Sequence, residues 1–337
     1  MEIAIRGSVA PPLLTPPPYL IAGGFRIVEL AALSLCQFGK VVIYVETAAD
    51  LPLILEGCSF EIRTLGEGEA DVPSIHVGCV PHLLKSPNLS CGGTELRLGR
   101  GDLLRAEPLT TLADFLEENV NVMRLALAKL KEVGVELVKG EAGGVVRGDV
   151  YLRGRIYEYA YVEGPAVVGP ASAVLPFTYI RPGTTLYYDS KVRDEAKNAV
   201  LDAYTRKQHG GYLGDTYVAS FVNFGAGTTV SNLKNTLGEI KPSYSQRRYK
   251  KLGPVFAEFV KTAIGTLVYG GKYIGPLSHV YGVVDRDVPP LSIFKNGAVL
   301  PMDLEKAREY LRRDLAQFGR GDLYRFYAVR LFQKPLF

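Results

Sequence analysis

All four cysteines and two of the four histidines lie in the first third of the chain, and these residue types are common zinc ligands. Four of them follow the pattern H-x2-C-x2-H…C: His76, Cys79, His82 and Cys91. Burial in a core is nevertheless the better interpretation, because cysteine is among the most buried residue types and typical zinc-finger spacings are absent. We therefore expect no metal site, and disulfide bonds stay an alternative if the source is a hyperthermophile.

The other two histidines, His209 and His279, lie in the second half of the chain. Because histidine titrates near neutral pH, His209 has the chemistry of a general base. Taken alone, it is more simply a histidine of a surface loop. Two histidines are also too few for a three-histidine zinc site. Whether His209 is a general base or an ordinary surface histidine depends on the structural elements that hold it.

Those elements are indicated by a six-residue repeat. Eight consecutive sixth positions are aliphatic: Val150, Ile156, Val162, Val168, Val174, Ile180, Leu186 and Val192. The repeat resumes at Val218, Phe224 and Val230 and again at Val268, Ile274 and Val280, with Phe256 and Thr262 extending it backward. A period of six fits a short strand plus a turn, with one aliphatic side chain per strand in a narrow interior. The pattern predicts a parallel β-helix from about residue 145 to 297.

Two stretches interrupt the repeat. The polar stretch Asp194–Gln208 is expected to loop out or to form a short helix, and the stretch Lys234–Lys251 is basic and rich in tyrosine. Insertions into repeat proteins tend to gather on the binding face. We therefore expect Lys234–Lys251 to lie near a binding site.

Helices and strands flank the β-helix. Thr111 and Asp114 resemble a capping box, and apolar residues at helical spacing follow until Gly134. Asp303 predicts the start of a C-terminal helix that ends at Gly319. The segments 2–5 and 40–46 read as strands and 27–38 as the helix between them, which is one βαβ unit. The predicted domains are 1–140, 141–300 and 301–337.

The composition sets limits on function. In 337 residues, 47% are apolar and 22% charged, which is typical of a globular protein. A net charge of +4 without long basic runs argues against a nucleic-acid-binding protein. Since no uninterrupted apolar span and no signal peptide are recognisable, we expect a cytoplasmic protein that has no membrane partner.

Four stretches carry a resemblance to a known family: Tyr179-Ile-Arg-Pro-Gly-Thr184, His209-Gly-Gly-Tyr-Leu-Gly-Asp215, Asn223-Phe-Gly-Ala-Gly-Thr-Thr-Val-Ser-Asn232 and Asp285-Arg-Asp-Val-Pro-Pro290. Over about 150 residues the chain resembles the acetyltransferase domain of the bifunctional N-acetylglucosamine-1-phosphate uridylyltransferase and glucosamine-1-phosphate N-acetyltransferase family, especially its archaeal sugar-1-phosphate nucleotidylyltransferase-like members. The resemblance implies a left-handed β-helix, a homotrimer with sites between chains and acetyl-CoA as co-substrate. In such a trimer we expect the basic stretch Lys234–Lys251 to reach across to the neighbouring chain, because both substrates carry phosphate groups.

The resemblance also implies roles for individual residues. His209 matches the general base that takes a proton from the sugar amine, and Asn232 would orient the substrate and the acyl group. Arg181 and Lys197 match the cations that bind the sugar phosphate. The implied remaining contacts are Tyr212 and Asn223 with sugar hydroxyls and Ala226, Gly227 and Lys295 with acetyl-CoA.

Departures from the family pattern affect the acyl acceptor. Leu233 stands where bacterial members have tyrosine, although archaeal members also use leucine there. Gly238 stands where a lysine is expected, and Lys234 or Lys241 could replace that lysine.

The first part of the chain resembles a degenerate nucleotidyltransferase domain in the segments 11–23 and 41–45. The Gly-rich phosphate loop is missing, because residues 6–10 contain one glycine, and Pro and Tyr replace a lysine of the proline-rich segment. We therefore expect the nucleotidyltransferase activity to be lost, with Mg²⁺ relevant only if it survives. The predicted function is acetylation of an amino-sugar 1-phosphate, most simply glucosamine 1-phosphate. The alternative is a non-catalytic subunit or scaffold that binds a sugar phosphate.

Overall fold

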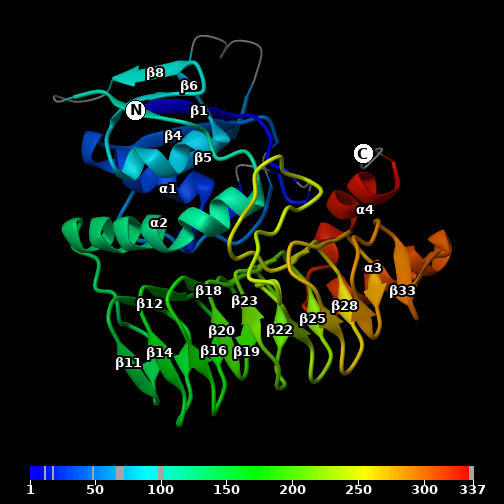
Figure 1. Cartoon of the computed structure of the whole chain (residues 1–337). Coiled ribbons are helices and arrows are strands. Elements are labelled where there is room, and N and C mark those ends of the chain that lie inside the picture. The colour runs from blue at the N-terminus through cyan, green and yellow to red at the C-terminus, as the bar shows by residue number, and fades with distance from the viewer. Residues whose placement is uncertain (11–12, 17–18, 48, 66–71, 98–101, 334–337) are drawn as a thin grey trace.

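The computed structural model describes residues 1–10, 13–16, 19–47, 49–65, 72–97 and 102–333. Pro11, Pro12, Pro17 and Pro18 of the proline-rich segment therefore lie outside the described residues. An N-terminal α/β part rests on a long β-helix, and two C-terminal helices lie at the side (Figure 1). No helix in the described ranges has the length and apolar character that crossing a membrane requires.

A parallel four-stranded sheet forms the centre of the N-terminal part, in the order β5 (Phe60–Thr64), β4 (Val41–Val45), β1 (Glu2–Arg6) and β6 (Ser74–His76). Helix α1 (Ile27–Leu35) and the 3₁₀ turn η2 (Cys36–Phe38) connect β1 to its neighbour β4, so the predicted βαβ unit is confirmed. The hairpin of β2 (Ile21–Ala22) and β3 (Phe25–Arg26) precedes α1.

Helix α2 (Leu112–Glu132) closes the N-terminal part. Thr111 and Asp114 form the predicted capping box, in which the Thr111 side chain accepts from the Asp114 N–H. The apolar side of α2 packs on α1 and on the 3₁₀ helix η4 (Val77–Leu84). A small sheet of β8 (Thr94–Arg97), β7 (Asn88–Cys91) and β9 (Leu104–Ala106) lies beyond η4.

Three sheets form the left-handed β-helix. We call them the lateral sheet, the open sheet and the covered sheet, and the covered sheet is the one that packs against the N-terminal part. The lateral sheet holds β10 (Glu141–Ala142), β13 (Arg155–Ile156), β16 (Ala173–Val174), β19 (Lys191–Val192), β22 (Arg206–Lys207), β25 (Asn223–Phe224), β28 (Lys261–Thr262), β31 (His279–Val280), β33 (Ser292–Lys295) and the antiparallel β34 (Ala298–Pro301). The open sheet holds β11 (Val145–Arg147), β14 (Tyr161–Glu163), β17 (Tyr179–Ile180), β20 (Glu195–Lys197) and β23 (Leu213–Gly214), continued by β26 (Thr229–Val230), β29 (Leu267–Val268) and β32 (Val283–Val284). The covered sheet holds β12 (Val150–Leu152), β15 (Ala166–Val168), β18 (Thr184–Leu186), β21 (Val200–Leu201), β24 (Tyr217–Val218), β27 (Val255–Phe256) and β30 (Tyr273–Ile274).

The repeat residues fill the interior of the β-helix. All eight of the first register are at most 1% exposed, and equivalent residues stack from coil to coil, as Ile156, Val174 and Val192 do. The prediction for residues 194–208 is wrong, because they form β20, β21 and β22 within a shortened coil. Small buried side chains, Ala196 and Ala199, replace the expected large aliphatics and hide the periodicity.

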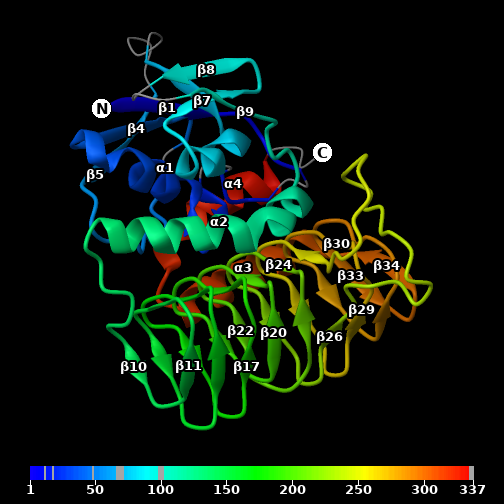
Figure 2. The ribbon, with the colours of Figure 1, turned by 60° about the vertical axis from the view of Figure 1, so that its left-hand side comes forward.

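The covered sheet joins the N-terminal part to the β-helix. Its outward aromatic residues, among them Tyr151 and Tyr217, belong to the same buried cluster as the core of the α/β part. Arg26 and Asp202 form a fully buried ion pair across this boundary at 2.9 Å. Figure 2 shows α2 running across the coils, which places one side of this helix beside the β-helix corners.

The C-terminal helices cover another corner of the β-helix. Helix α3 (Leu304–Gln317) begins at the predicted cap Asp303, and α4 (Tyr324–Phe332) follows the short turn η5 (Gly321–Leu323). Phe318 and Tyr327 pack against the aromatic stack of Phe221 and Phe259.

The four cysteines form two disulfide bonds, Cys36–Cys58 and Cys79–Cys91. Both sulfurs of the H-x2-C-x2-H…C pattern are thereby used in the second bond. In the described parts of the chain, no group of three or more histidine, cysteine or acidic residues is arranged to hold a metal ion.

Candidate active site

The open sheet brings together four of the residues singled out in the sequence. Arg181 follows β17, Lys197 ends β20, Tyr212 precedes β23 and Asn232 follows β26, so each stands on a different coil of the same sheet. Because the strands are parallel and in register, residues at the same end of successive strands form a row. Arg181 and Lys197 occupy this row, Asn232 lies beyond the end of β26, and Tyr212 Oη joins the group through its hydrogen bond with Asn232. We call these four residues the acceptor cluster.

The acceptor cluster holds two cations close together. Arg181 donates from Nη1 to Glu195 Oε1 at 2.9 Å and is 38% exposed at its side chain. Burial lowers the pKa of Lys197, and the nearby charges of Lys251 and Arg181 lower it further, whereas Asp215 opposes this shift. Two cations that disfavour one another in this way create a site for an anion such as a phosphate group.

Tyr212 and Asn232 form the polar end of the cluster. Asn232 Nδ2 donates to Tyr212 Oη at 3.3 Å and to Asp215 Oδ2 at 2.5 Å. Burial raises the pKa of Tyr212, and the negative charges of Asp215 and Glu195 act in the same direction, so its hydroxyl keeps its proton at neutral pH. Asp215 lies in one of the stretches that carry the family resemblance, but the resemblance implies no role for it, and only the structure shows its contact with Asn232.

His209 lies outside this cluster, on the turn that leads from the lateral sheet to the open sheet. Its side chain is exposed, and its carbonyl oxygen accepts from the Nζ of Lys207. Lys207 is a buried lysine at an interior position, and burial lowers its pKa to about 8. His209 therefore stands at the edge of the open sheet, and none of the described hydrogen bonds links its imidazole to the acceptor cluster.

The residues expected near acetyl-CoA continue from His209 along the same edge. Gly227 N donates to Gly210 O at 3.0 Å, which sets the Ala226–Gly227 turn directly beside the His209 turn. The Gly265 N–H then bonds to Ala226 O at 2.7 Å on the next coil. Lys295 ends β33 farther along, where its ammonium lies 5.7 Å from the ring centroid of Tyr281.

Two predicted contact residues lie apart from the acceptor cluster. Asn223 is exposed on the lateral sheet, where it pairs with Arg206 and Lys261. Lys241 is exposed in the inserted segment 234–251. Within a single chain, neither residue belongs to the cluster.

The inserted segment 234–251 interrupts the β-helix between β26 and β27, as predicted. Its second half folds back onto its own chain, because Arg247 forms ion pairs with Asp114 and Glu117 of α2 and Tyr249 donates to Asp114 Oδ1 at 2.8 Å. Arg247 is thereby held by partners in its own chain, and the expectation that the segment reaches across to a neighbour stays a prediction.

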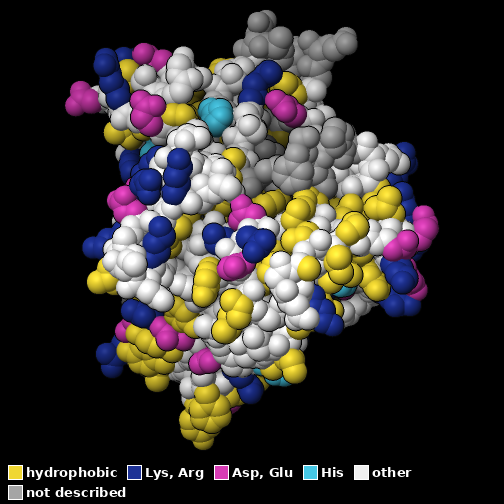
Figure 3. All heavy atoms as spheres, turned by 45° about the vertical axis from the view of Figure 1, so that its right-hand side comes forward, with side chains coloured by type: hydrophobic (Ala, Val, Ile, Leu, Met, Phe, Trp, Pro, Cys, Tyr) yellow, Lys and Arg dark blue, Asp and Glu magenta, His cyan; other side chains and the backbone are white. Residues whose placement is uncertain are grey.

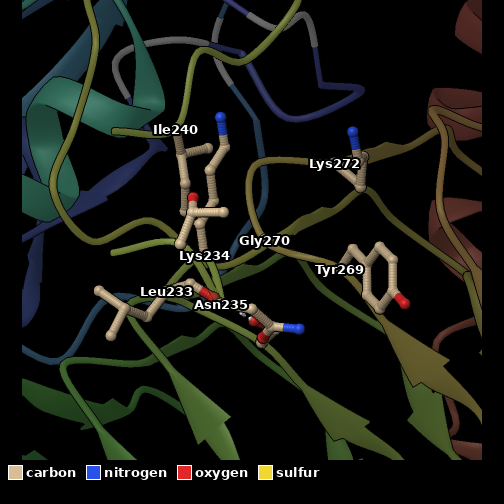
Figure 4. Close-up of a pocket in the computed structure, with 9 residues that line it drawn as sticks. Leu233, Lys234, Asn235, Ile240, Tyr269, Gly270 and Lys272 are labelled. Atoms are coloured by element: carbon tan, nitrogen blue, oxygen red, sulfur yellow. Dashed lines mark hydrogen bonds between the residues drawn. The ribbon is translucent and has the colours of Figure 1, made fainter. Parts of the chain in front are cut away.

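The first half of the insertion borders a cavity of about 300 Å³ (Figure 4). Lys234 and Lys272 line it, and their ammonium groups rise on the same side of the pocket in the close-up. Leu233, Ile240 and the ring of Tyr269 supply apolar walls. Lys234, one of the two candidates for the missing lysine, therefore lines a cavity close to Asn232 in the chain, and Lys241 does not.

Besides the repeat and the β-helix, the chain shares part of its sequence with bifunctional nucleotidylyltransferase/acetyltransferases. A bifunctional sugar-1-phosphate nucleotidylyltransferase/acetyltransferase of Sulfurisphaera tokodaii is 34% identical over 128 residues, which are 36% of this chain and 32% of that protein. The bifunctional protein GlmU of Streptomyces coelicolor is 41% identical over 136 residues, which are 39% of this chain and 26% of that protein. The family resemblance of the sequence is thereby confirmed, and the matched part spans less than a third of each of these relatives.

Comparison with solved structures gives weaker similarities. The acetyltransferase domain of PglB from Neisseria gonorrhoeae is 10% identical with a TM-score of 0.29, over 89% of this chain and 99% of that one. The UDP-N-acetylglucosamine acyltransferase of Francisella novicida is also 10% identical with a TM-score of 0.29, over 56% of this chain and 86% of that one. At these scores the superpositions say nothing about the site. No family model matches the chain.

Proposed function

We propose that the chain is an acetyl-CoA-dependent N-acetyltransferase that acts on an amino-sugar 1-phosphate, with glucosamine 1-phosphate as the first candidate. The observation that carries this proposal is the acceptor cluster, in which Arg181 and Lys197 stand beside the polar pair Tyr212 and Asn232 on one face. The cations suit a phosphate, and the hydroxyl and amide suit a sugar.

The proposed reaction forms one bond and breaks one. The sugar amine attacks the thioester carbonyl of acetyl-CoA, so that a C–N bond forms and the C–S bond breaks. His209 would accept the proton of the amine and return it to the leaving thiolate, which balances the step. Ala226 and Gly227, beside the His209 turn, would lie along the bound acetyl-CoA, and Lys295 would meet its phosphates.

We further propose that the active enzyme is a homotrimer in which a neighbouring chain supplies the second wall of the site. The acceptor cluster and the His209 edge lie on an open face, whereas a site for two substrates is normally concave and excludes water. Uncovered apolar side chains support this proposal, and on the open sheet Leu267 is 45% and Val283 51% exposed. Figure 3 shows hydrophobic side chains gathered over the β-helix on one face of the molecule.

The proposal includes the loss of nucleotidyltransferase activity. The loop after β1 has one glycine, Gly7, and a Cβ at that position would lie 2.4 Å from the His76 ring. A loop that packs so closely on a side chain is poorly suited to wrapping phosphate groups. The N-terminal part would then have a structural role, and Mg²⁺ would not be required.

Release of CoA from acetyl-CoA in the presence of glucosamine 1-phosphate tests the proposal, with mass spectrometry of the acetylated sugar. His209→Ala should lower the rate by about a hundredfold or more, the usual contribution of a general base. His279→Ala, which removes the other histidine of the β-helix, is the matched control and should keep most of the rate. If the wild-type protein binds the sugar phosphate but never acetyl-CoA, the non-catalytic alternative is favoured instead.

A further inference from the structure

A buried asparagine of the N-terminal part bonds directly to the turns that carry the two cations of the acceptor cluster. Asn119 of α2 is 1% exposed, and its Nδ2 donates to Gly183 O at 2.6 Å and to Asn198 Oδ1 at 2.9 Å. Gly183 lies two residues after Arg181, and Asn198 directly follows Lys197. Its own Oδ1 accepts from Gly23 N at 2.9 Å, so every polar atom of the side chain is used.

The chain of bonds continues through Asn198 to Asp215. Asn198 Nδ2 donates to Leu116 O at 3.0 Å and to Asp215 Oδ1 at 2.9 Å. Asn198 and Asp215 are each 8% exposed, so these bonds are largely shielded from water. A partner left without its bond at this place would incur the cost of a buried unsatisfied polar group.

Asp215 then fixes the orientation of Asn232. A carboxylate only accepts hydrogen bonds, so Asn232 must present Nδ2 to it and turn Oδ1 away. The same Nδ2 donates to Tyr212 Oη, which leaves the Tyr212 hydroxyl hydrogen free to be donated. Among the described residues, Asn232 Oδ1 accepts no hydrogen bond, so the pair of Asn232 and Tyr212 offers one hydrogen-bond acceptor and one donor to a ligand.

We propose that Asp215, with Asn198 and Asn119, is a positioning device through which helix α2 of the N-terminal part sets the acceptor cluster. The inference rests on the proposed function for its substrate. It gives the N-terminal part a task other than nucleotide chemistry: α2 holds the turns of Arg181 and Lys197 and, through Asp215, the amide of Asn232.

Asp215→Asn tests the contact between Asp215 and Asn232. The new amide offers one oxygen to two amide donors, so either Asn198 or Asn232 loses its partner. We expect the KM for the amino-sugar phosphate to rise by about tenfold to a hundredfold, with the KM for acetyl-CoA changed less than about twofold. The double variant Asn198→Asp with Asp215→Asn restores an acceptor for Asn232 and should recover part of the loss. Equal changes in both KM values would contradict a positioning role.

Asn119→Leu tests the contacts of helix α2 with Gly183 and Asn198, which lie in the turns that carry Arg181 and Lys197. This change should raise the KM for the sugar phosphate and leave that for acetyl-CoA unchanged, although Asn119 touches neither substrate. Asn121→Leu, an exposed position on the same helix, is the matched control. An unchanged sugar-phosphate KM in folded Asn119→Leu protein would overturn the inference.

A readout without catalysis separates this inference from the proposed function. In a crystal structure of Asp215→Asn, or of Asn119→Leu if the first does not fold, the side chain of Asn232 or the 181–183 turn should have moved. An unchanged cluster in the variant that folds would overturn the inference even if the wild-type enzyme acetylates the sugar. A displaced cluster with no acetylation by the wild type would instead refute only the proposed function.

Discussion

Tyr212 lies directly over Gly214, so that a Cβ added to Gly214 would stand 2.2 Å from Tyr212 Oη. Real Cβ atoms do not approach other atoms so closely, and the tyrosine is the group that must move. The position of the Tyr212 hydroxyl therefore depends on the absence of a side chain at Gly214. A substitution at Gly214 tests the acceptor cluster without replacing any of its four residues.

Gly214→Ala should displace the Tyr212 ring and break its hydrogen bond with Asn232. We expect the KM for the sugar phosphate to rise by roughly tenfold, since one hydrogen bond of a partly buried pair contributes about 1 kcal/mol and more when a partner is left unpaired. Gly238→Ala is the control, because the nearest atom to its added Cβ is Thr236 Oγ1 at 3.4 Å. Steady-state kinetics with both substrates checks this, and an unaffected sugar-phosphate KM would contradict the role of Tyr212.

The ion pair of Arg26 and Asp202 predicts a large loss of stability when it is broken. Both side chains are at most 1% exposed, so Asp202→Ala leaves a buried guanidinium without its carboxylate. The free energy of unfolding should fall by about 3–5 kcal/mol, measured by urea denaturation. Glu61→Ala, which breaks the exposed pairs with Lys40 and Arg63, is the comparison and should have little effect. Similar losses for both variants would contradict the prediction that the buried ion pair contributes more to stability than the exposed ion pairs.

The β-helix could be predicted because its narrow interior accepts one aliphatic residue per strand. This constraint produces the six-residue repeat of buried aliphatic residues that begins with Val150 and Ile156. Where Lys207 and Ala196 fill the interior instead, the prediction failed. The packing of the N-terminal part on the covered sheet also corresponds to a pattern in the sequence. Strands of the covered sheet, such as 150–152 and 166–168, are apolar at every position because both their faces are buried.

The acceptor cluster could be predicted only in part. Arg181, Lys197, Tyr212 and Asn232 were found through the resemblance, and the structure places them in one cluster. Asp215 and Asn119 were missed because their importance comes from contacts between residues far apart in the chain, which no local spacing records. The disulfide pairing was likewise hidden, since four cysteines allow three pairings.

Lys207 predicts an unusual dependence of stability on pH. Burial lowers its pKa from 10.5 to about 8, so below pH 8 the amine is charged in both states and the folded state carries the full cost of burying it. Between pH 8 and 10.5 the unfolded chain binds a proton that the folded chain does not, and the free energy of unfolding rises with pH. Lys207→Met should remove this rise.

The wild type should therefore gain up to about 3 kcal/mol relative to Lys207→Met as the pH goes from 7 to 10.5. Urea denaturation at a series of pH values measures the difference between the two proteins. Lys191→Met, which removes an outward-facing lysine from the neighbouring strand, is the matched control. Curves for wild type and Lys207→Met that stay parallel over this range would contradict the prediction.

The exposed apolar side chains of the open sheet lead us to predict a homotrimer. Leu267 lies on this face and is 45% exposed, and a neighbouring chain that packed there would bury it and complete the site. Light scattering at micromolar concentration should give a mass of about three chains of 36.8 kDa each. Leu267→Glu should shift the protein toward the monomer and lower acetylation, because a charge buried in an interface is strongly disfavoured. Leu304→Glu, at a position 53% exposed on α3, should leave the trimer intact. A monomeric wild type that still acetylates the sugar would show that one chain builds the whole site.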